Sequence, residues 1–268
     1  MILSPQELES RELHPETVRR AVQLVTINGY ILFESVLPPE LLAELQTEFK
    51  RVFDEHRDGT EANRGTNRFQ MHLPFREPFI NPALIENPLA LAVIDQLIGP
   101  DCVCHYFASD TALPGSEHQK VHADIGLLFP EAPLSLPPYS VVLNIPLCDH
   151  REDNGPLEIW PGGTHLMPGS SGHGLAGSAG GINMQELSTT MHSQHCLMPA
   201  GSLLIRDMRT WHRGTPNHSA EPRPNLALIY SRPWLKTHYP PIEIAPSTYE
   251  GLSERARRLF RFENHRGK

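Results

Sequence analysis

Residues 202–231 read SLLIRDMRTWHRGTPNHSAEPRPNLALIYS, and this stretch begins and ends with a short run of apolar, β-favouring residues. Between the two runs, glycine and several prolines interrupt the chain as they do at turns. Similar short runs, bounded by proline or glycine, occur from Asp101 onward. Strands punctuated in this way are typical of an all-β sandwich or barrel. We expect strands at 103–108, 121–129, 140–148, 157–160, 202–206 and 225–231.

The first hundred residues differ, because their apolar residues recur mainly at helical spacing. Helices are predicted at 15–24, from Pro38 onward and at 88–98, and a short strand is predicted at 30–33. A proline opens each helix, where the first turn tolerates it, and Gly99-Pro100 ends the third. The sequence therefore predicts a mainly β protein with flanking helices.

A chain of 268 residues is long enough for one well-buried domain, and we expect a single domain over 1–268. Within it we expect mainly helical support at 1–100, a β core at 101–235 and a C-terminal segment at 236–268. A loop insertion at 167–195 begins with a stretch rich in glycine and serine, which excludes a core strand. This insertion is either a lid over a site or a plain connection, and we favour the lid because long loops within compact domains usually serve a function.

The net charge of -8, without any basic run, argues against a nucleic-acid partner. No apolar stretch approaches the 18 or so residues of a membrane helix, and the N-terminus is polar, so we expect a cytoplasmic protein without a membrane partner. The four cysteines match no zinc signature and are expected to be reduced thiols. The oligomeric state stays open.

Candidate metal ligands come from two distant stretches. His122 and Asp124 are two residues apart, so on a strand their side chains share one face. His212 follows about 90 residues later, and two imidazoles with one carboxylate form a set that suits ferrous iron with three positions left open. His218 is the rival third ligand, but its turn setting favours a surface residue.

Arg223 lies 11 residues after His212, beyond a run with Gly214 and Pro216. A hairpin between two strands would return Arg223 to the metal site. A buried guanidinium there would provide a planar fork for the distal carboxylate of a dicarboxylate cosubstrate. The alternative is an ordinary surface ion pair.

Several motifs together resemble the phytanoyl-CoA dioxygenase group of iron(II)/2-oxoglutarate oxygenases. They span nearly the whole chain: Asn28-Gly29-Tyr30, Pro114-Gly115-Ser116, His122-x-Asp124, Asp153-Asn154-Gly155-Pro156-Leu157, Trp160-Pro161-Gly162-Gly163-Thr164-His165, Trp211-His212, Asn217-x-Ser219 and Arg223.

This resemblance implies a double-stranded β-helix (jelly-roll, cupin-like) core with His122, Asp124 and His212 as iron(II) ligands. It also implies 2-oxoglutarate and dioxygen as cosubstrates, with Arg223 anchoring 2-oxoglutarate. Halogenases of the superfamily lack the ligand carboxylate, so the presence of Asp124 excludes halogenation. Ser109 stands where relatives hold the cosubstrate with a polar residue, often an amide donor.

Further candidates are polar residues on predicted strands or near the motifs. Asn144 interrupts an apolar run and either contacts cosubstrate or substrate or faces solvent, and Thr111 is a cosubstrate candidate beside Ser109. Arg68, Gln70 and His72 alternate on what could be a strand entering the site, with an exposed polar face as the alternative, and His165 is a substrate-side candidate.

The function expected from all of this is a dioxygenase that oxidises, and most simply hydroxylates, a small metabolite. Two alternatives remain: a metal-binding jelly-roll protein without oxygenase activity, and a zinc hydrolase that uses the same ligands. The sequence identifies no substrate, although the acidic chain makes a CoA thioester or other polyphosphate less attractive.

Overall fold

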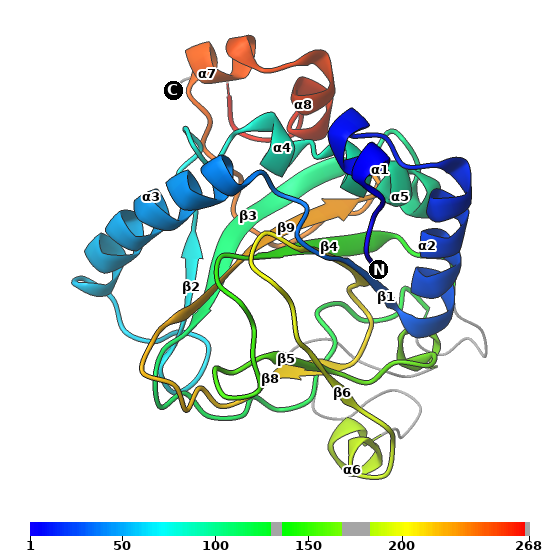
Figure 1. Cartoon of the computed structure of the whole chain (residues 1–268), viewed down its shortest axis with the longest axis vertical. Helices are drawn as coiled ribbons and strands as arrows, with labels where there is room; N and C mark the ends of the chain where they lie inside the picture. The colour runs from blue at the N-terminus through cyan, green and yellow to red at the C-terminus, as the bar shows by residue number, and fades with distance from the viewer. Residues whose placement is uncertain (130–135, 168–182, 266–268) are drawn as a thin grey trace.

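The computed structural model describes residues 1–129, 136–167 and 183–265. Its main element is a six-stranded antiparallel sheet in the order β1-β7-β4-β9-β3-β2, and a three-stranded antiparallel sheet, β6-β5-β8, lies beneath it (Figure 1). The larger sheet consists of β1 (Tyr30–Phe33), β2 (Arg68–His72), β3 (Val103–Ala112), β4 (Ser140–Pro146), β7 (Leu203–Asp207) and β9 (Arg223–Ser231); the smaller one of β5 (Leu157–Ile159), β6 (Gln194–Cys196) and β8 (His212–Gly214).

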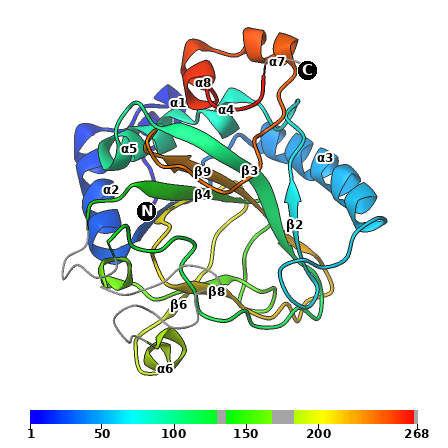
Figure 2. The ribbon, with the colours of Figure 1, turned by 180° about the vertical axis from the view of Figure 1, so that it is seen from behind.

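Helices cover the outer face of the six-stranded sheet, and the views from both sides place the three-stranded sheet, with α6 beyond it, on the opposite side (Figures 1 and 2). The two facing antiparallel sheets form the double-stranded β-helix core that the sequence motifs imply. The helices are α1 (Pro5–Ser10), α2 (Pro15–Asn28), α3 (Pro39–Arg57), α4 (Pro82–Ile85), α5 (Pro88–Ile98), α6 (Met184–Ser188), α7 (Pro246–Gly251) and α8 (Glu254–Leu259).

Strand β4 shows how alternation divides the two sides of the larger sheet. All seven of its residues are buried, because both faces of the strand are covered. Val141, Leu143 and Ile145 point outward into the main apolar core with the helices. Val142 and Asn144 point the other way, toward a cavity between the sheets. One period-two strand thus supplies both the packing against the helices and part of the cavity wall.

Helix α5, which packs into this core, has clear sequence signals at both ends. The Asn87 side chain caps its first turn by accepting hydrogen bonds from the backbone N–H groups of Leu89 and Ala90, at 3.0 and 3.1 Å. Pro88 occupies the first turn, and Gly99 ends the helix at a φ of 92°. The helix therefore begins and ends where the sequence predicts.

Two predictions about the strands are wrong in detail. Residues 121–129 do not form a strand: His122 makes an isolated bridge to His212, and the chain then turns so that the Asp124 N–H reaches the Met208 carbonyl at 2.9 Å. The segment from His212 to Arg223 is not a hairpin, since β8 and β9 belong to different sheets. Its turn residues instead carry the chain from one sheet to the other.

Residues 168–182 of the predicted insertion at 167–195 lie outside the described residues. The interpretation of this insertion as a lid therefore stays a prediction. Its last part includes the short helix α6 and the start of β6. Within the described residues, no helix combines the length and the apolar character needed to cross a membrane.

Candidate metal centre

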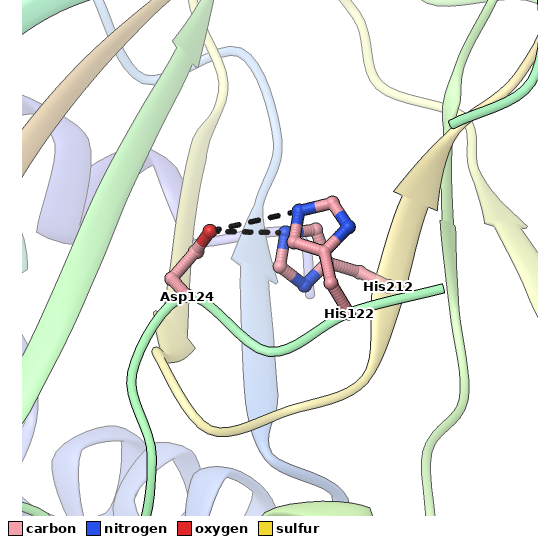
Figure 3. Close-up of side chains that lie close together, drawn as sticks. All are labelled: His122, Asp124 and His212. Atoms are coloured by element: carbon pink, nitrogen blue, oxygen red, sulfur yellow. Dashed lines mark ion pairs between the residues drawn. The ribbon is translucent and has the colours of Figure 1, made fainter. Parts of the chain in front are cut away.

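Three side chains converge where the two sheets meet. The Nε2 atoms of His122 and His212 lie 3.8 and 3.4 Å from Oδ1 of Asp124, and both imidazoles face that oxygen in Figure 3. One ligand atom from each residue lies within 4.8 Å of the other two. The arrangement can hold one metal ion, with two nitrogens and one carboxylate oxygen as donors.

Backbone pairing brings the two distant stretches together. His122 and His212 exchange both backbone hydrogen bonds across their bridge, at 3.0 and 2.9 Å, which places the two rings 4.3 Å apart. Strand β8 is paired in turn with β5 through Ile159 and His212. The register of a single antiparallel pair therefore decides that the two imidazoles meet.

Carbonyl groups determine which ring nitrogen of each histidine carries the proton. Nδ1 of His122 lies 2.8 Å from the Lys120 carbonyl, and Nδ1 of His212 lies 2.9 Å from the Thr210 carbonyl. A carbonyl oxygen only accepts, which favours Nδ1 as the N–H in both rings and Nε2 as the atom with the lone pair. At His212 the Arg206 guanidinium also lies 3.2 Å from Nδ1, but the contact with the Thr210 carbonyl is the shorter one, at 2.9 Å. Both lone pairs thus point toward Asp124, as metal ligation requires.

Arg206 on β7 binds one oxygen of the Asp124 carboxylate and leaves the other toward the histidines. Its Nη2 donates to Oδ2 at 2.6 Å, while Oδ1 faces the histidines. Its Nη1 lies 3.2 Å from Nδ1 of His212, so the buried guanidinium packs against two members of the triad. Burial alone would raise the pKa of Asp124, but His212 and Arg206 outweigh it and hold that pKa well below its usual range.

A cavity extends from the triad along the inner face of the larger sheet, and Arg223 at the start of β9 lines its buried end. Arg223 is 3% exposed, and it forms no hydrogen bond or ion pair within the described part of the chain. Burial lowers the pKa of its guanidinium, an effect that nearby Asp110 opposes. An unpaired guanidinium at such a depth requires an anionic partner.

Other polar atoms at this end lack partners as well. Among the described residues, buried atoms without a hydrogen bond occur on cavity-lining Asp110, Asn144, His150, Arg206 and Asn225. His150 has both ring nitrogens in this state. Such a concentration of unsatisfied donors and acceptors in one cavity fits a small polar molecule with several oxygens.

The residues present therefore fit both groups that the motifs imply. The donor set of His122, Asp124 and His212 suits ferrous iron, and the unpaired guanidinium of Arg223 suits a carboxylate. Asn144 and Gln70, two candidates whose orientation the sequence left open, both line the cavity.

Five other candidates lie elsewhere. Ser109 and Thr111 share the outward face of β3 with Phe107, and the Ser109 hydroxyl donates to the Met71 carbonyl at 3.4 Å; alternation gives the cavity position to Asp110.

Arg68 is fully buried and donates through Nε and Nη2 to the Glu117 and Thr215 carbonyls beside the cavity, while its Nη1 has no hydrogen-bond partner among the described residues. His165 donates to the Thr26 carbonyl at 3.0 Å and does not line the cavity. His72 is exposed, although its ring lies 5.7 Å from that of the cavity residue Tyr106.

Sequence reasoning missed several cavity residues. Alternation along β3 carries the signal that Tyr106 and Asp110 share a face with Ala108. No local signal marks Tyr239, which reaches the cavity from the C-terminal segment. The other missed residues that line the cavity are Arg64, Gln119, His150, Arg206 and Asn225.

Known proteins resemble this chain in sequence and in fold. A curated relative, the dioxygenase trt7 of Aspergillus terreus (strain NIH 2624 / FGSC A1156), is 24% identical over 168 residues, which cover 58% of this chain and 58% of the relative, so the chain matches little more than half of its length.

Two solved structures share the fold. The epimerase SnoN in complex with Fe3+, alpha ketoglutarate and nogalamycin RO has a TM-score of 0.62 and 18% identity, covering 82% of this chain and 85% of that one. EctD from S. alaskensis with bound Fe has a TM-score of 0.62 and 17% identity, covering 82% and 79%. The phytanoyl-CoA dioxygenase (PhyH) family model matches residues 26–225, about three quarters of the sequence, and the chain therefore belongs to that family.

Proposed function

We propose that this protein is an iron(II)/2-oxoglutarate-dependent oxygenase that oxidises a small molecule. The observation that carries the proposal is one cavity with a His-Asp-His triad at one place and a buried, unpaired guanidinium, Arg223, at another. Membership of the phytanoyl-CoA dioxygenase family supports it. So does the named relative, which is a dioxygenase, and the SnoN structure, which holds iron and alpha ketoglutarate.

In this proposal His122, Asp124 and His212 hold the iron, and Arg223 binds the distal carboxylate of 2-oxoglutarate. When bound, iron with 2-oxoglutarate and dioxygen supplies an oxidant that can remove a hydrogen atom from a C–H bond, while 2-oxoglutarate becomes succinate and carbon dioxide. The Lys120 and Thr210 carbonyls keep both Nε2 lone pairs available. Arg206 occupies Oδ2 of Asp124, so the carboxylate offers one oxygen and leaves coordination positions open.

The side chains around the Arg223 guanidinium supply the rest of the cosubstrate site. Asn144, His150 and Asn225 line this end with unpartnered polar atoms and are buried. A carboxylate there would accept from Arg223 and from the amide or imidazole donors, in a site that excludes water. The depth of this end keeps the cosubstrate away from solvent.

We also propose hydroxylation of a small metabolite as the simplest outcome, because apolar Val142, Ala227 and Ile229 line the same cavity and provide a dry wall for a C–H-bearing substrate.

The four cysteines are free thiols, which supports a reducing compartment such as the cytoplasm.

An anaerobic titration tests the proposal. Ferrous iron followed by 2-oxoglutarate should produce a weak visible charge-transfer band, because the cosubstrate would bind directly to the iron. The substitution Arg223→Gln should raise the 2-oxoglutarate concentration at half-maximal band at least tenfold, since loss of a charged hydrogen-bond partner costs about 1.5–3 kcal/mol. Arg57→Gln, an exposed residue away from the cavity, is the matched control.

Oxygen then separates the alternatives. The oxygenase forms succinate from 2-oxoglutarate when oxygen is admitted, even without its substrate, at a low uncoupled rate. A non-catalytic metal-binding protein would show metal binding but no succinate, and a zinc hydrolase would be active with zinc and without 2-oxoglutarate. Absence of both the band and succinate in the iron-loaded protein would refute the proposal.

A further inference from the structure

The cavity has a second, half-buried end whose polar residues the cosubstrate does not use. We call it the outer end, and it is lined by Arg64, Gln70, Tyr106, Gln119 and Tyr239. These residues come from the loop before β2, from β2 and β3, from the segment before His122 and from the C-terminal segment. Five separate parts of the chain thus converge beside the metal triad.

Arg64 is held by its backbone while its guanidinium has no partner. Its N–H donates to the Arg68 carbonyl at 3.2 Å, and its carbonyl accepts from Nε2 of Gln119 at 3.2 Å. Within the described ranges, its side chain makes no hydrogen bond and no ion pair. The loop therefore holds the Arg64 backbone beside the cavity, and in the described part of the chain no carboxylate lies within ion-pair distance of its guanidinium.

The charge of Arg64 acts on the two tyrosines at the outer end. Burial raises the pKa of Tyr239 to about 12, the Asp124 carboxylate adds to this rise, and Arg64 opposes it. Burial likewise raises the pKa of Tyr106, again with Arg64 as the opposing cation. The tyrosine rings lie 4.8 Å apart at an angle of 56°. Arg64 is consequently close to an aromatic wall that adjoins the triad.

The balance of charges around the cavity also leaves Arg64 without a matching anion. The formally charged residues that line the cavity are Arg64, Arg206, Arg223, Asp110 and Asp124, which leaves one positive charge in excess. Ferrous iron and the dianion of 2-oxoglutarate cancel each other, so the loaded site keeps that excess. Arg206 is paired with Asp124, and Asp110 acts on Arg223, which leaves Arg64 as the unmatched cation.

We infer that the substrate carries one carboxylate, which pairs with Arg64 at the outer end, and a ring or chain that packs against Tyr106 and Tyr239. This inference rests on the proposed function and adds the chemical class of the substrate. A planar guanidinium accepts a carboxylate in a bidentate geometry. One unmatched arginine suits one anionic group and not a polyphosphate. The substrate body then lies between the aromatic wall and the iron ligands, beside Val142 and Ile229.

Matched acids and amides test the inference in the anaerobic iron(II)/2-oxoglutarate complex. The probes are phenylacetate, 3-phenylpropionate and 4-phenylbutyrate, each compared with its primary amide. Binding is read from the shift of the visible band and from calorimetric titration of the manganese(II)/N-oxalylglycine form, which does not turn over. At least one acid should bind tenfold or more tightly than its amide, a difference of about 1.4 kcal/mol.

Substitutions locate the preference. Arg64→Gln should reduce the acid-to-amide ratio to about one, and Arg64→Lys should keep part of it, because the charge remains while the planar fork is lost. Arg57→Gln, at the end of α3 and away from the cavity, should leave the ratio unchanged. Saturating 2-oxoglutarate keeps the probes from the Arg223 end, where they would appear as competitors of the cosubstrate.

Two results would overturn the inference: no acid in the series binds better than its amide, or the preference survives in Arg64→Gln. Either result can occur with an intact charge-transfer band, in which case the proposed function stands and only the substrate class is wrong. Absence of the band from iron and 2-oxoglutarate alone is instead a failure of the proposed function.

Discussion

Arg206 is the residue on which the shape of the metal centre depends most directly after the triad itself. It is 3% exposed, it donates to Oδ2 of Asp124 at 2.6 Å, and its other terminal nitrogen lies 3.2 Å from the His212 ring. Without this partner the Asp124 carboxylate could rotate and offer both oxygens to a metal. The guanidinium thus acts as a positioning group that keeps Oδ1 toward the histidines.

We predict that Arg206→Gln weakens metal binding by about 10–100-fold, the usual effect of losing a partner that orients a metal ligand. The measurement is the dissociation constant for manganese(II), read by calorimetry, which does not depend on turnover. The matched control is Arg213→Gln: Arg213 lies on β8 beside His212, and the substitution breaks its ion pair with Glu158 of β5. This control should change the dissociation constant little. Equal effects of the two substitutions would assign Arg206 a general structural role.

His150 offers a second test at this scale, at the Arg223 end of the cavity. Burial holds its pKa well below the usual value, with Arg223 adding to the effect, so the ring is neutral and one nitrogen can donate. We predict that His150→Phe raises the 2-oxoglutarate concentration at half-maximal band about tenfold or more, because a hydrogen bond to a carboxylate is worth about 1.5–3 kcal/mol.

His150→Gln keeps a donor of similar length and should recover part of the affinity. Unchanged 2-oxoglutarate binding in the Phe variant would exclude His150 from the cosubstrate site.

At the scale of the elements, one glycine joins the helical layer to the metal centre. Gly29 ends α2 with a φ of 86° and leads directly into β1. Its carbonyl accepts from the Thr210 hydroxyl at 3.1 Å, and the Thr210 carbonyl in turn accepts from Nδ1 of His212. The end of a helix near the N-terminus therefore supports the residue that orients a candidate ligand.

We predict that Gly29→Ala destabilises the protein by about 1–3 kcal/mol, the cost of a left-handed conformation in a residue with a side chain. A Cβ here would also lie 2.3 Å from the Thr210 hydroxyl oxygen, which must move. Urea unfolding measures the change, and Gly59→Ala, where an added Cβ meets nothing, is the control. A loss of stability no larger than in the control would contradict this account.

At the scale of the whole molecule, the metal centre lies where the two sheets meet. His122 and Asp124 come from a segment that makes an isolated bridge to β8 at His122, and His212 comes from β8 of the smaller sheet. Arg206, which contacts Asp124, belongs to β7 of the larger sheet. Figure 3 shows His122 and Asp124 on one stretch of chain and His212 on another. An ion at this point would therefore tie the 122–124 segment to β8, which the backbone bridge between His122 and His212 also joins.

We predict that manganese(II) with N-oxalylglycine raises the melting temperature, and that a chelator reverses the rise. A ligand at 100 times its dissociation constant stabilises the native state by about 2.7 kcal/mol, and each kcal/mol corresponds to about 2–4 °C in a chain of this size. Asp124→Ala should abolish the difference between loaded and unloaded protein, whatever its own melting temperature. A rise that persists in this variant would place the ligand elsewhere.

The alternation of side chains along a strand does not reveal which face is turned inward. Alternation on β4 placed Asn144 on a strand without deciding its face, and the structure turns it to the cavity. On β3 the expected cosubstrate residue was Ser109, but the inward position belongs to Asp110. A period of two separates the two faces of a strand, and only packing against the helices decides which face is outward.

The sequence by itself predicted a helical first part followed by a β-rich core, and it proposed the four site residues His122, Asp124, His212 and Arg223. These follow from local patterns and from motifs whose spacing is specific. Only the tertiary structure decided how β8 and β9 divide between two sheets, and which polar groups share the cavity with the triad. Arg64, His150, Arg206 and Tyr239 come from separate parts of the chain. Their meeting depends on strand register and sheet packing, which are long-range interactions that no local pattern records.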